Sequence, residues 1–192
     1  MLPLIAVILA LLCVRSSTWA GQQSFGFGKQ EIGLSLGYSP ATPLGGAVRN
    51  VHYFYVAPKW GIGISDSLGG DSWYRGNFEF LAEGAFLGEI QPKSGIGGGM
   101  TALFRYNFLY GRNFIPFIEA GGGVVALDFD LERQKDGRNY SGHWGLGFHY
   151  FFSETTAFTG EWRIHHISNG QGRNNQGITN SLFLIGISYF LN

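Results

Sequence analysis

The chain has 192 residues, with 13 lysines and arginines balanced by 13 aspartates and glutamates. Because a nucleic-acid-binding surface needs an excess of basic residues, this balance argues against a nucleic-acid partner. Charged residues make up only 14% of the chain, aromatic residues make up 16%, and 31 residues are glycine. This composition excludes a disordered chain and, at this length, favours one folded domain.

An apolar run opens the chain at residues 2–14 and is followed by small residues that end at Ala20. The run is shorter than the roughly 20 residues that span a bilayer, so it is more typical of a secretory signal peptide than of a membrane anchor. The only cysteine, Cys13, lies within it, so the exported chain would form no disulfide. We therefore assign residues 1–20 to a signal peptide and residues 21–192 to the exported domain.

Eight later segments of about ten residues alternate between apolar and polar side chains, a pattern typical of transmembrane β-strands. In chain order, the apolar faces of the segments include Ile32 and Leu34, Val51 and Tyr53, Phe78 and Phe80, Met100 and Phe104, Ile118 and Val124, Trp144 and Leu146, Trp162 and Ile164, and Phe183 and Ile185. These apolar and aromatic faces suit contact with lipid.

The opposite faces carry glycines and charged residues, among them Glu79, Glu83, Arg105, Glu119, Glu161 and Arg163. Inside a narrow barrel, carboxylates and guanidinium groups can pair. A soluble, lipocalin-like barrel would instead place its apolar residues around a cavity. The recurring charges on one face favour an all-β, eight-stranded antiparallel transmembrane β-barrel, and a lumen filled by these side chains argues against a pore.

The connections between segments fall into short and long classes. If the first strand begins on the periplasmic side, short turns at 110–113 and 153–155 lie at the periplasmic end, together with a connection near 67–71. The longer connections are then expected to face outside the cell, at residues 39–46, 86–95, 130–139 and 169–179.

The seventh segment, 156–168, places His166 and Ser168 on the same face as Trp162 and Ile164. Polar groups on a lipid-facing wall are costly, because hydrocarbon offers them no hydrogen bonds. One interpretation is that they lie at the membrane interface and end the strand. The other is that a base and a hydroxyl on one surface attack an ester of an outer-leaflet lipid.

Two C-terminal segments carry a further pattern, namely His166-Ile167-Ser168-Asn169-Gly170 and Gly177-Ile178-Thr179-Asn180-Ser181, separated by a loop rich in Gln, Asn and Gly. They resemble the lipid A 3-O-deacylases of the PagL type, which are also classified as acyloxyacyl hydrolases. Residues 105–108 and 118–124 also resemble this family of outer-membrane eight-stranded barrels. The resemblance implies that Ser168 is the nucleophile and that His166 is the general base and acid.

The family usually completes its triad with an acidic residue at the start of the last strand, and this place falls on Asn180. Asp and Glu are absent from the sequence after Glu161. Asn180 could accept a hydrogen bond from the imidazole, but it could not offset the imidazolium charge. Because the alternation in the last segment gives Asn180 the parity of the lumen face, this role requires a bulge or a loop position.

An oxyanion hole would require donors near the nucleophile. The candidates are the backbone amides around Asn169 and Gly170, and the side chain of Asn174 or Asn175. The resemblance implies no metal and no organic cofactor.

The sequence predicts a membrane-embedded serine esterase of the bacterial outer membrane that removes an ester-linked acyl chain from lipid A. Its partner would be lipopolysaccharide in the outer leaflet. The alternative is a non-catalytic structural or adhesive barrel that has lost turnover together with the acidic triad member. The sequence leaves open which ester is cleaved and whether the chain forms a homodimer.

Overall fold

The computed structural model of the protein describes residues 21–41, 50–131, 134, 136–170 and 176–191. The predicted signal peptide, residues 1–20, lies outside this set. Among these described residues, the one helical element is the 3-10 helix η1 (Gln22–Ser24), which precedes the strands. Within the described ranges, no helix is long and apolar enough to cross a membrane.

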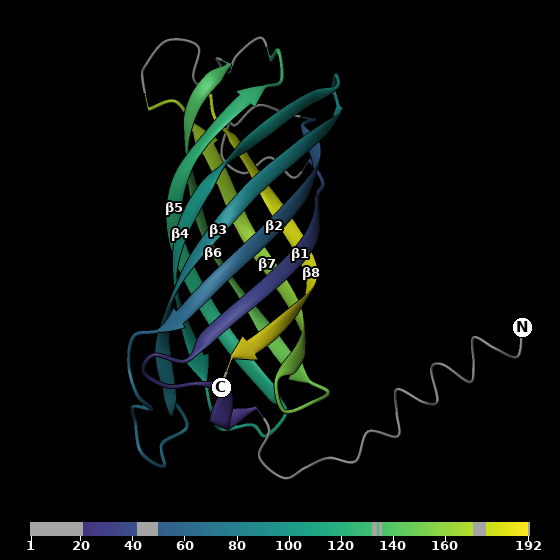
Figure 1. Ribbon diagram of the computed structural model, residues 1–192. Coiled ribbons are helices and arrows are strands. Elements are labelled where there is room, and N and C mark those ends of the chain that lie inside the picture. Colours follow the sequence, from purple (N-terminus) through teal and green to yellow (C-terminus); the bar gives the residue numbers. More distant parts are fainter. Residues whose placement is uncertain (1–20, 42–49, 132–133, 135, 171–175, 192) are drawn as a thin grey trace, which may run out of the picture.

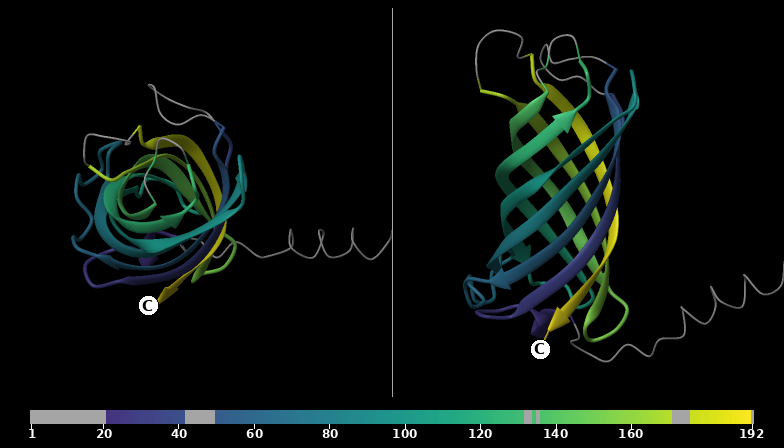
Figure 2. Two further views of the ribbon diagram at one scale, coloured as in Figure 1. Left: turned by 90° about the horizontal axis from the view of Figure 1, so that it is seen from above. Right: turned by 45° about the horizontal axis from the view of Figure 1, so that its top comes forward.

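Eight antiparallel strands pair in sequence order and close into a barrel, because β8 also pairs with β1 (Figures 1 and 2). They are β1 (Gln30–Ser39), β2 (His52–Gly63), β3 (Gly76–Gln91), β4 (Gly95–Phe108), β5 (Phe114–Asp128), β6 (Gly137–Phe151), β7 (Thr156–Ser168) and β8 (Ile178–Leu191). Closure leaves no unpaired sheet edge, so the backbone N–H and C=O groups of the strands can be hydrogen-bonded even in a membrane, where no water is available to them. The predicted fold is confirmed.

Side chains alternate between the lumen and the outer wall along every strand. The outer wall exposes large apolar side chains, including Leu36, Phe104, Trp144 and Ile185. The predicted charged face is buried in the lumen, where Arg105 has no exposed surface. Exposed apolar residues around the whole barrel are the surface that a lipid environment requires.

The prediction for β2 was wrong about which side of the wall its apolar residues face. Val51, Tyr53 and Tyr55 point into the lumen and are buried, whereas Phe54 and Trp60 are exposed outside. Alternation could not settle this strand, because both of its faces are apolar. These three residues belong to a cluster of apolar side chains inside the lumen. The hydroxyl of Tyr53 lies 2.7 Å from Nδ1 of His165, which is hydrogen-bonding distance.

An ion-pair network fills the middle of the lumen and joins strands that are distant in sequence. Arg105 donates to Glu31 at 3.0 Å and also pairs with Glu119. Arg163 donates to the other oxygen of Glu119 at 2.6 Å and forms a bidentate pair with Glu83 at 2.8 and 2.9 Å. Because Glu119 bridges the two guanidinium groups, the network ties opposite sides of the barrel together.

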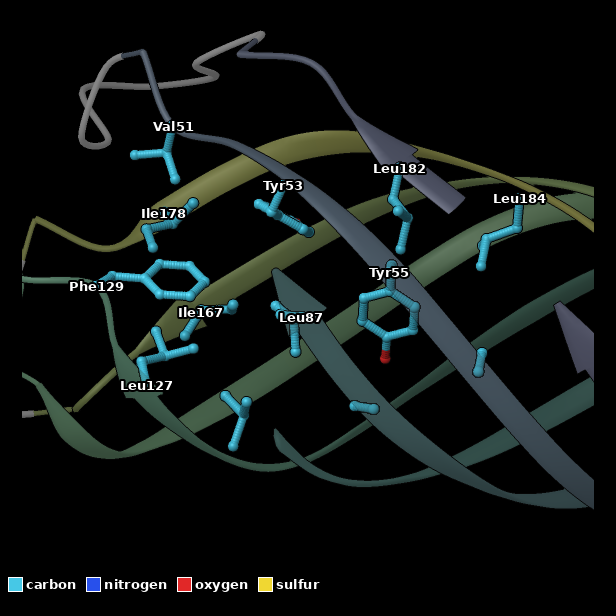
Figure 3. Close-up of a cluster of buried hydrophobic side chains, with 13 residues drawn as sticks. Val51, Tyr53, Tyr55, Leu87, Leu127, Phe129, Ile167, Ile178, Leu182 and Leu184 are labelled. Atoms are coloured by element: carbon cyan, nitrogen blue, oxygen red, sulfur yellow. The ribbon is translucent and has the colours of Figure 1, made fainter. Parts of the chain in front are cut away.

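Apolar clusters fill the lumen on both sides of this network. At the end opposite the chain termini, the cluster includes Val51, Tyr53, Leu87, Leu127, Phe129, Ile167, Ile178 and Leu182 (Figure 3). Near the termini, Leu109, Ile115, Phe151, Ala157 and Phe190 form a second cluster, against which Phe25 packs. Side chains therefore fill the lumen along its length.

The connections differ from the expected division into short and long loops. β3 continues to Gln91 and pairs with β4 as far as Gly95, so only residues 92–94 connect them where a long loop was predicted. The β2–β3 connection spans 64–75 and lies at the end of the barrel where η1 and the last residues of β8 are found (Figure 1). The glycines at the start of β4 conceal its alternation, which explains why the extended pairing was missed.

We expect Arg163→Met to lower the free energy of unfolding by about 3–5 kcal/mol, because it removes the cation that pairs with three buried carboxylates, those of Glu83, Glu119 and Glu161. Urea titration of the barrel in lipid vesicles, followed by tryptophan fluorescence, measures this change. Arg138→Met is the control, since Arg138 is exposed on β6, and should change the stability by less than about 0.5 kcal/mol. Equal stabilities of the two variants would contradict the structural role of the network.

Candidate active site

A polar patch interrupts the apolar outer wall where β7 ends and β8 begins. It consists of His166 and Ser168 on β7 and of Thr179 and Ser181 on β8, all at outward-facing positions. Further along the same strands, the outward positions carry large apolar residues, namely Phe158, Trp162, Ile164, Phe183, Ile185 and Ile187. The end of β7 and the start of β8 lie at the end of the barrel opposite η1 and the last residues of β8 (Figure 1).

The register of β7 against β8 fixes this patch. Ile167 pairs with Ile178, and both side chains point into the lumen, where they are fully buried in the apolar cluster (Figure 3). The neighbouring pair, His166 with Thr179, must therefore point outward. Packing inside the barrel thus determines which groups meet on its outside.

The imidazole of His166 is held by the first residues of β8 and the residue before it. Its Nδ1 lies 2.7 Å from Oγ1 of Thr179, which is hydrogen-bonding distance. Gly177 lies against the ring, because a Cβ added there would be only 2.9 Å from Cε1. The backbone N–H of Gly177 in turn donates to the buried side chain of Gln134 at 3.0 Å.

Ser168 is half-buried and lies two residues from His166 on the same outer face. Within the described part of the chain, no side-chain hydrogen bond joins the two residues. Such bonds are often long without substrate and shorten when the substrate binds. Because both side chains lie on the outer face of β7, the structure agrees with the predicted placement of the pair on the outer wall.

Asn180 does not meet His166, and the structure contradicts its assignment as the third member of the triad. β8 runs without a bulge, so Asn180 pairs with His165 and points into the lumen, where it is 1% exposed. Its Nδ2 donates to the carbonyl oxygen of Val51 at 2.8 Å. The position that faces His166 is that of Thr179, one residue earlier.

The candidate oxyanion-hole residues lie directly after Ser168 in the chain. Gly170 has a φ of +70°, a conformation that glycine adopts without strain, and it turns the chain beside the ring of Tyr140. Asn169 is half-buried at the end of β7. Asn174 and Asn175 lie outside the described residues.

The wall beside His166 is open toward β6. Gly142 is its cross-strand neighbour, and a Cβ built there would meet nothing within 4 Å. Tyr140 and Trp144, the next outward residues on either side, are both exposed. A substrate chain can therefore approach the imidazole along the wall, between two aromatic side chains.

Sequence reasoning missed Thr179, Gly177 and Gln134. The signal for Thr179 was present, because it shares its odd-numbered parity with Phe183 and Ile185 on the lipid face. No comparable signal pointed to Gln134, which reaches the site from the connection between β5 and β6.

Comparison with known proteins provides a family and a fold. A sequence model described as lipid A 3-O-deacylase (PagL) matches residues 45–188. The crystal structure of the outer membrane enzyme PagL has a TM-score of 0.58 and 19% identity, and the match covers 80% of this chain and 97% of that one. The outer membrane protein OprG from Pseudomonas aeruginosa has a TM-score of 0.52 and 14% identity, with 88% and 99% covered.

The two solved structures, at these identities, support the fold alone. A search of curated proteins finds no match. The family model spans most of the chain, including β7, β8 and the polar patch. The chain belongs to the lipid A 3-O-deacylase (PagL) family.

Proposed function

We propose that this outer-membrane barrel is a serine esterase that hydrolyses an ester-linked acyl chain of lipid A, with Ser168 as nucleophile and His166 as general base. Family membership supports the lipid A deacylase activity. The observation that carries the residue assignment is the placement of an imidazole and a hydroxyl together on a wall that is otherwise apolar. A lipid ester can reach them there without leaving the membrane.

In the first half of the reaction, Nε2 of His166 accepts the proton of the Ser168 hydroxyl as Oγ attacks the ester carbonyl. The resulting oxyanion would be stabilised by backbone amides around Asn169 and Gly170. Collapse of this intermediate breaks the bond to the sugar oxygen, which takes the proton from the imidazolium. The products of this half are the sugar alcohol and an acyl ester on Ser168.

In the second half, His166 removes a proton from water, which attacks the acyl ester. Collapse returns the proton to Ser168 and releases the fatty acid. The apolar side chains that flank the patch on the wall, Trp144 and Ile164 among them, would contact the departing acyl chain. No step calls for a metal or an organic cofactor.

The site belongs at the outer leaflet if the chain termini face the periplasm. The patch lies where β7 ends and β8 begins, at the barrel end opposite η1 and the last residues of β8 (Figure 1). Lipopolysaccharide in that leaflet is then the partner of the barrel. Removal of residues 1–20 during export stays a prediction from the sequence, and whether the chain forms a homodimer stays open.

We expect Ser168→Ala to abolish loss of an acyl chain from lipid A, because it removes the nucleophile while leaving the barrel intact. Mass spectrometry of lipid A from cells that express each variant measures the loss. Ser181→Ala is the matched control, since Ser181 is an outward-facing serine of the same patch, and it should retain activity.

Unchanged deacylation by Ser168→Ala would refute the assignment of the nucleophile. If the wild-type barrel removes no acyl chain and a serine-directed phosphonate fails to label Ser168 in detergent micelles, the non-catalytic structural or adhesive barrel is the correct alternative.

We expect Asn180→Leu to keep the deacylation rate of the folded protein within about twofold, because Asn180 faces the lumen and does not contact His166. Its stability should fall by about 1–3 kcal/mol, since the Val51 carbonyl loses its buried donor. Rates normalised to the amount of folded barrel separate the two effects. A loss of activity as large as that of His166→Ala would contradict this expectation and would show that Asn180 takes part in catalysis.

A further inference from the structure

We propose that Thr179 is the positioning residue of His166 and that a neutral hydroxyl takes the place of the acidic triad member in this chain. The inference rests on the proposed function of the His166–Ser168 pair. It begins from the contact of 2.7 Å between Nδ1 of His166 and Oγ1 of Thr179. The two residues are also direct cross-strand partners.

The direction of this hydrogen bond follows from the chemistry. Nε2 must be unprotonated to accept the proton of Ser168, so in the reactive tautomer the proton lies on Nδ1. A hydroxyl oxygen has lone pairs that can accept a bond from Nδ1–H, as a carboxylate would. Thr179 therefore stabilises the tautomer that makes His166 a base, which is the orienting role of the third residue in a triad.

The position of Thr179 is rigid enough for this role. Threonine is branched at Cβ, which restricts its χ1 angle, and the residue lies within a continuously paired strand. Its neighbour Ile178 is buried in the lumen cluster and keeps the register from slipping. Oγ1 is thus held at a fixed place on the wall.

A second contact confines the imidazole on another side. The ring lies against Gly177, whose φ is +68° and whose missing side chain leaves the necessary space. Gln134 holds the backbone of Gly177, and its own Nε2 donates to Asn139 at 2.6 Å. The start of β8 and the residue before it therefore hold the His166 ring in two ways: Thr179 forms a hydrogen bond with it, and Gly177 packs against it.

The described carboxylates on β7 cannot substitute for the missing acid. Glu161 faces the lumen, is buried, and pairs with Lys59 and Arg163. Among the described residues, no carboxylate pairs with the imidazole of His166, whose Nδ1 has Thr179 as its partner. Thr179 would thus orient the ring without offsetting the charge that it takes up during the reaction.

The first test compares Thr179→Val with Thr179→Ser on lipopolysaccharide in detergent micelles. Valine keeps the shape of threonine but cannot accept the bond, so kcat should fall tenfold or more, a part of the roughly 10²–10⁴-fold contribution of general base catalysis. KM should stay unchanged. Serine retains the hydroxyl and should keep kcat within about threefold of the wild type.

Nitrogen NMR of histidine-labelled protein provides a readout that does not depend on turnover. The His166 ring signals are identified by their absence in His166→Gln. In the wild type they should show a proton on Nδ1 and none on Nε2, whereas in Thr179→Val the Nε2-protonated tautomer should appear. Thr179→Ser should resemble the wild type.

A third test changes the charge of the partner. In Thr179→Glu the carboxylate should stabilise the imidazolium, so the loss of activity on the acid side should begin about one pH unit higher than in the wild type. An acid limb that does not move would show that residue 179 does not control the ring and would contradict the proposal.

Full kcat in Thr179→Val, or an unchanged tautomer in its NMR spectrum, would overturn the role of Thr179. Loss of kcat in both the Val and Ser variants would assign Thr179 to packing alone and would also overturn it. Failure of the proposed function is a separate result, because it appears as deacylation that persists in Ser168→Ala. The tautomer measurement tests Thr179 whether or not lipid A is the substrate.

Discussion

The closed barrel allows each strand residue only two environments, the lumen or the lipid-facing wall, and the register of the strands decides between them. At the end of β7 this choice separates His165, inside, from His166, outside. On β8 it separates Asn180 from Thr179 in the same way. A slip of one residue would exchange both pairs, because side chains alternate with a period of two. Chemistry on the outer surface therefore depends on what fixes the register.

Two kinds of interaction inside the lumen fix the register of the strands: the central ion pairs and the apolar packing. The central ion pairs demand particular partners across the barrel, since each buried carboxylate or guanidinium group left alone would be costly. The apolar cluster around Ile167 and Ile178 then carries this register to the end of β7 and β8. The side chains of Ile167 and Ile178 both point into the lumen, yet their burial keeps His166 paired with Thr179 on the outer face. The proposed active site is thus the outer face of a structural cluster.

The sequence predicted the fold because most strands have one apolar face and one charged or glycine-rich face. It failed at β2, where Tyr53 and Tyr55 made both faces look suited to lipid. It also failed at Asn180, where counting along the family pattern placed the third residue. The family pattern places the third residue at the start of the last strand, but the residue there that shares the outer face with His166 is Thr179. The parity of β8 contained the correct answer, but only the observed pairing excludes a bulge.

A hydroxyl at position 179 has a physical advantage that a carboxylate lacks. The patch is surrounded by apolar wall, and a charge facing hydrocarbon must either be hydrated or find a counter-ion. Thr179 needs neither, because its hydroxyl is uncharged and its oxygen can accept the hydrogen bond from the imidazole. The corresponding disadvantage would arise during the proposed reaction, because a hydroxyl does not offset the charge of the imidazolium as a carboxylate would. In the proposed active site, the hydroxyl therefore offers less stabilisation of the transition state but places no additional charge at the membrane surface.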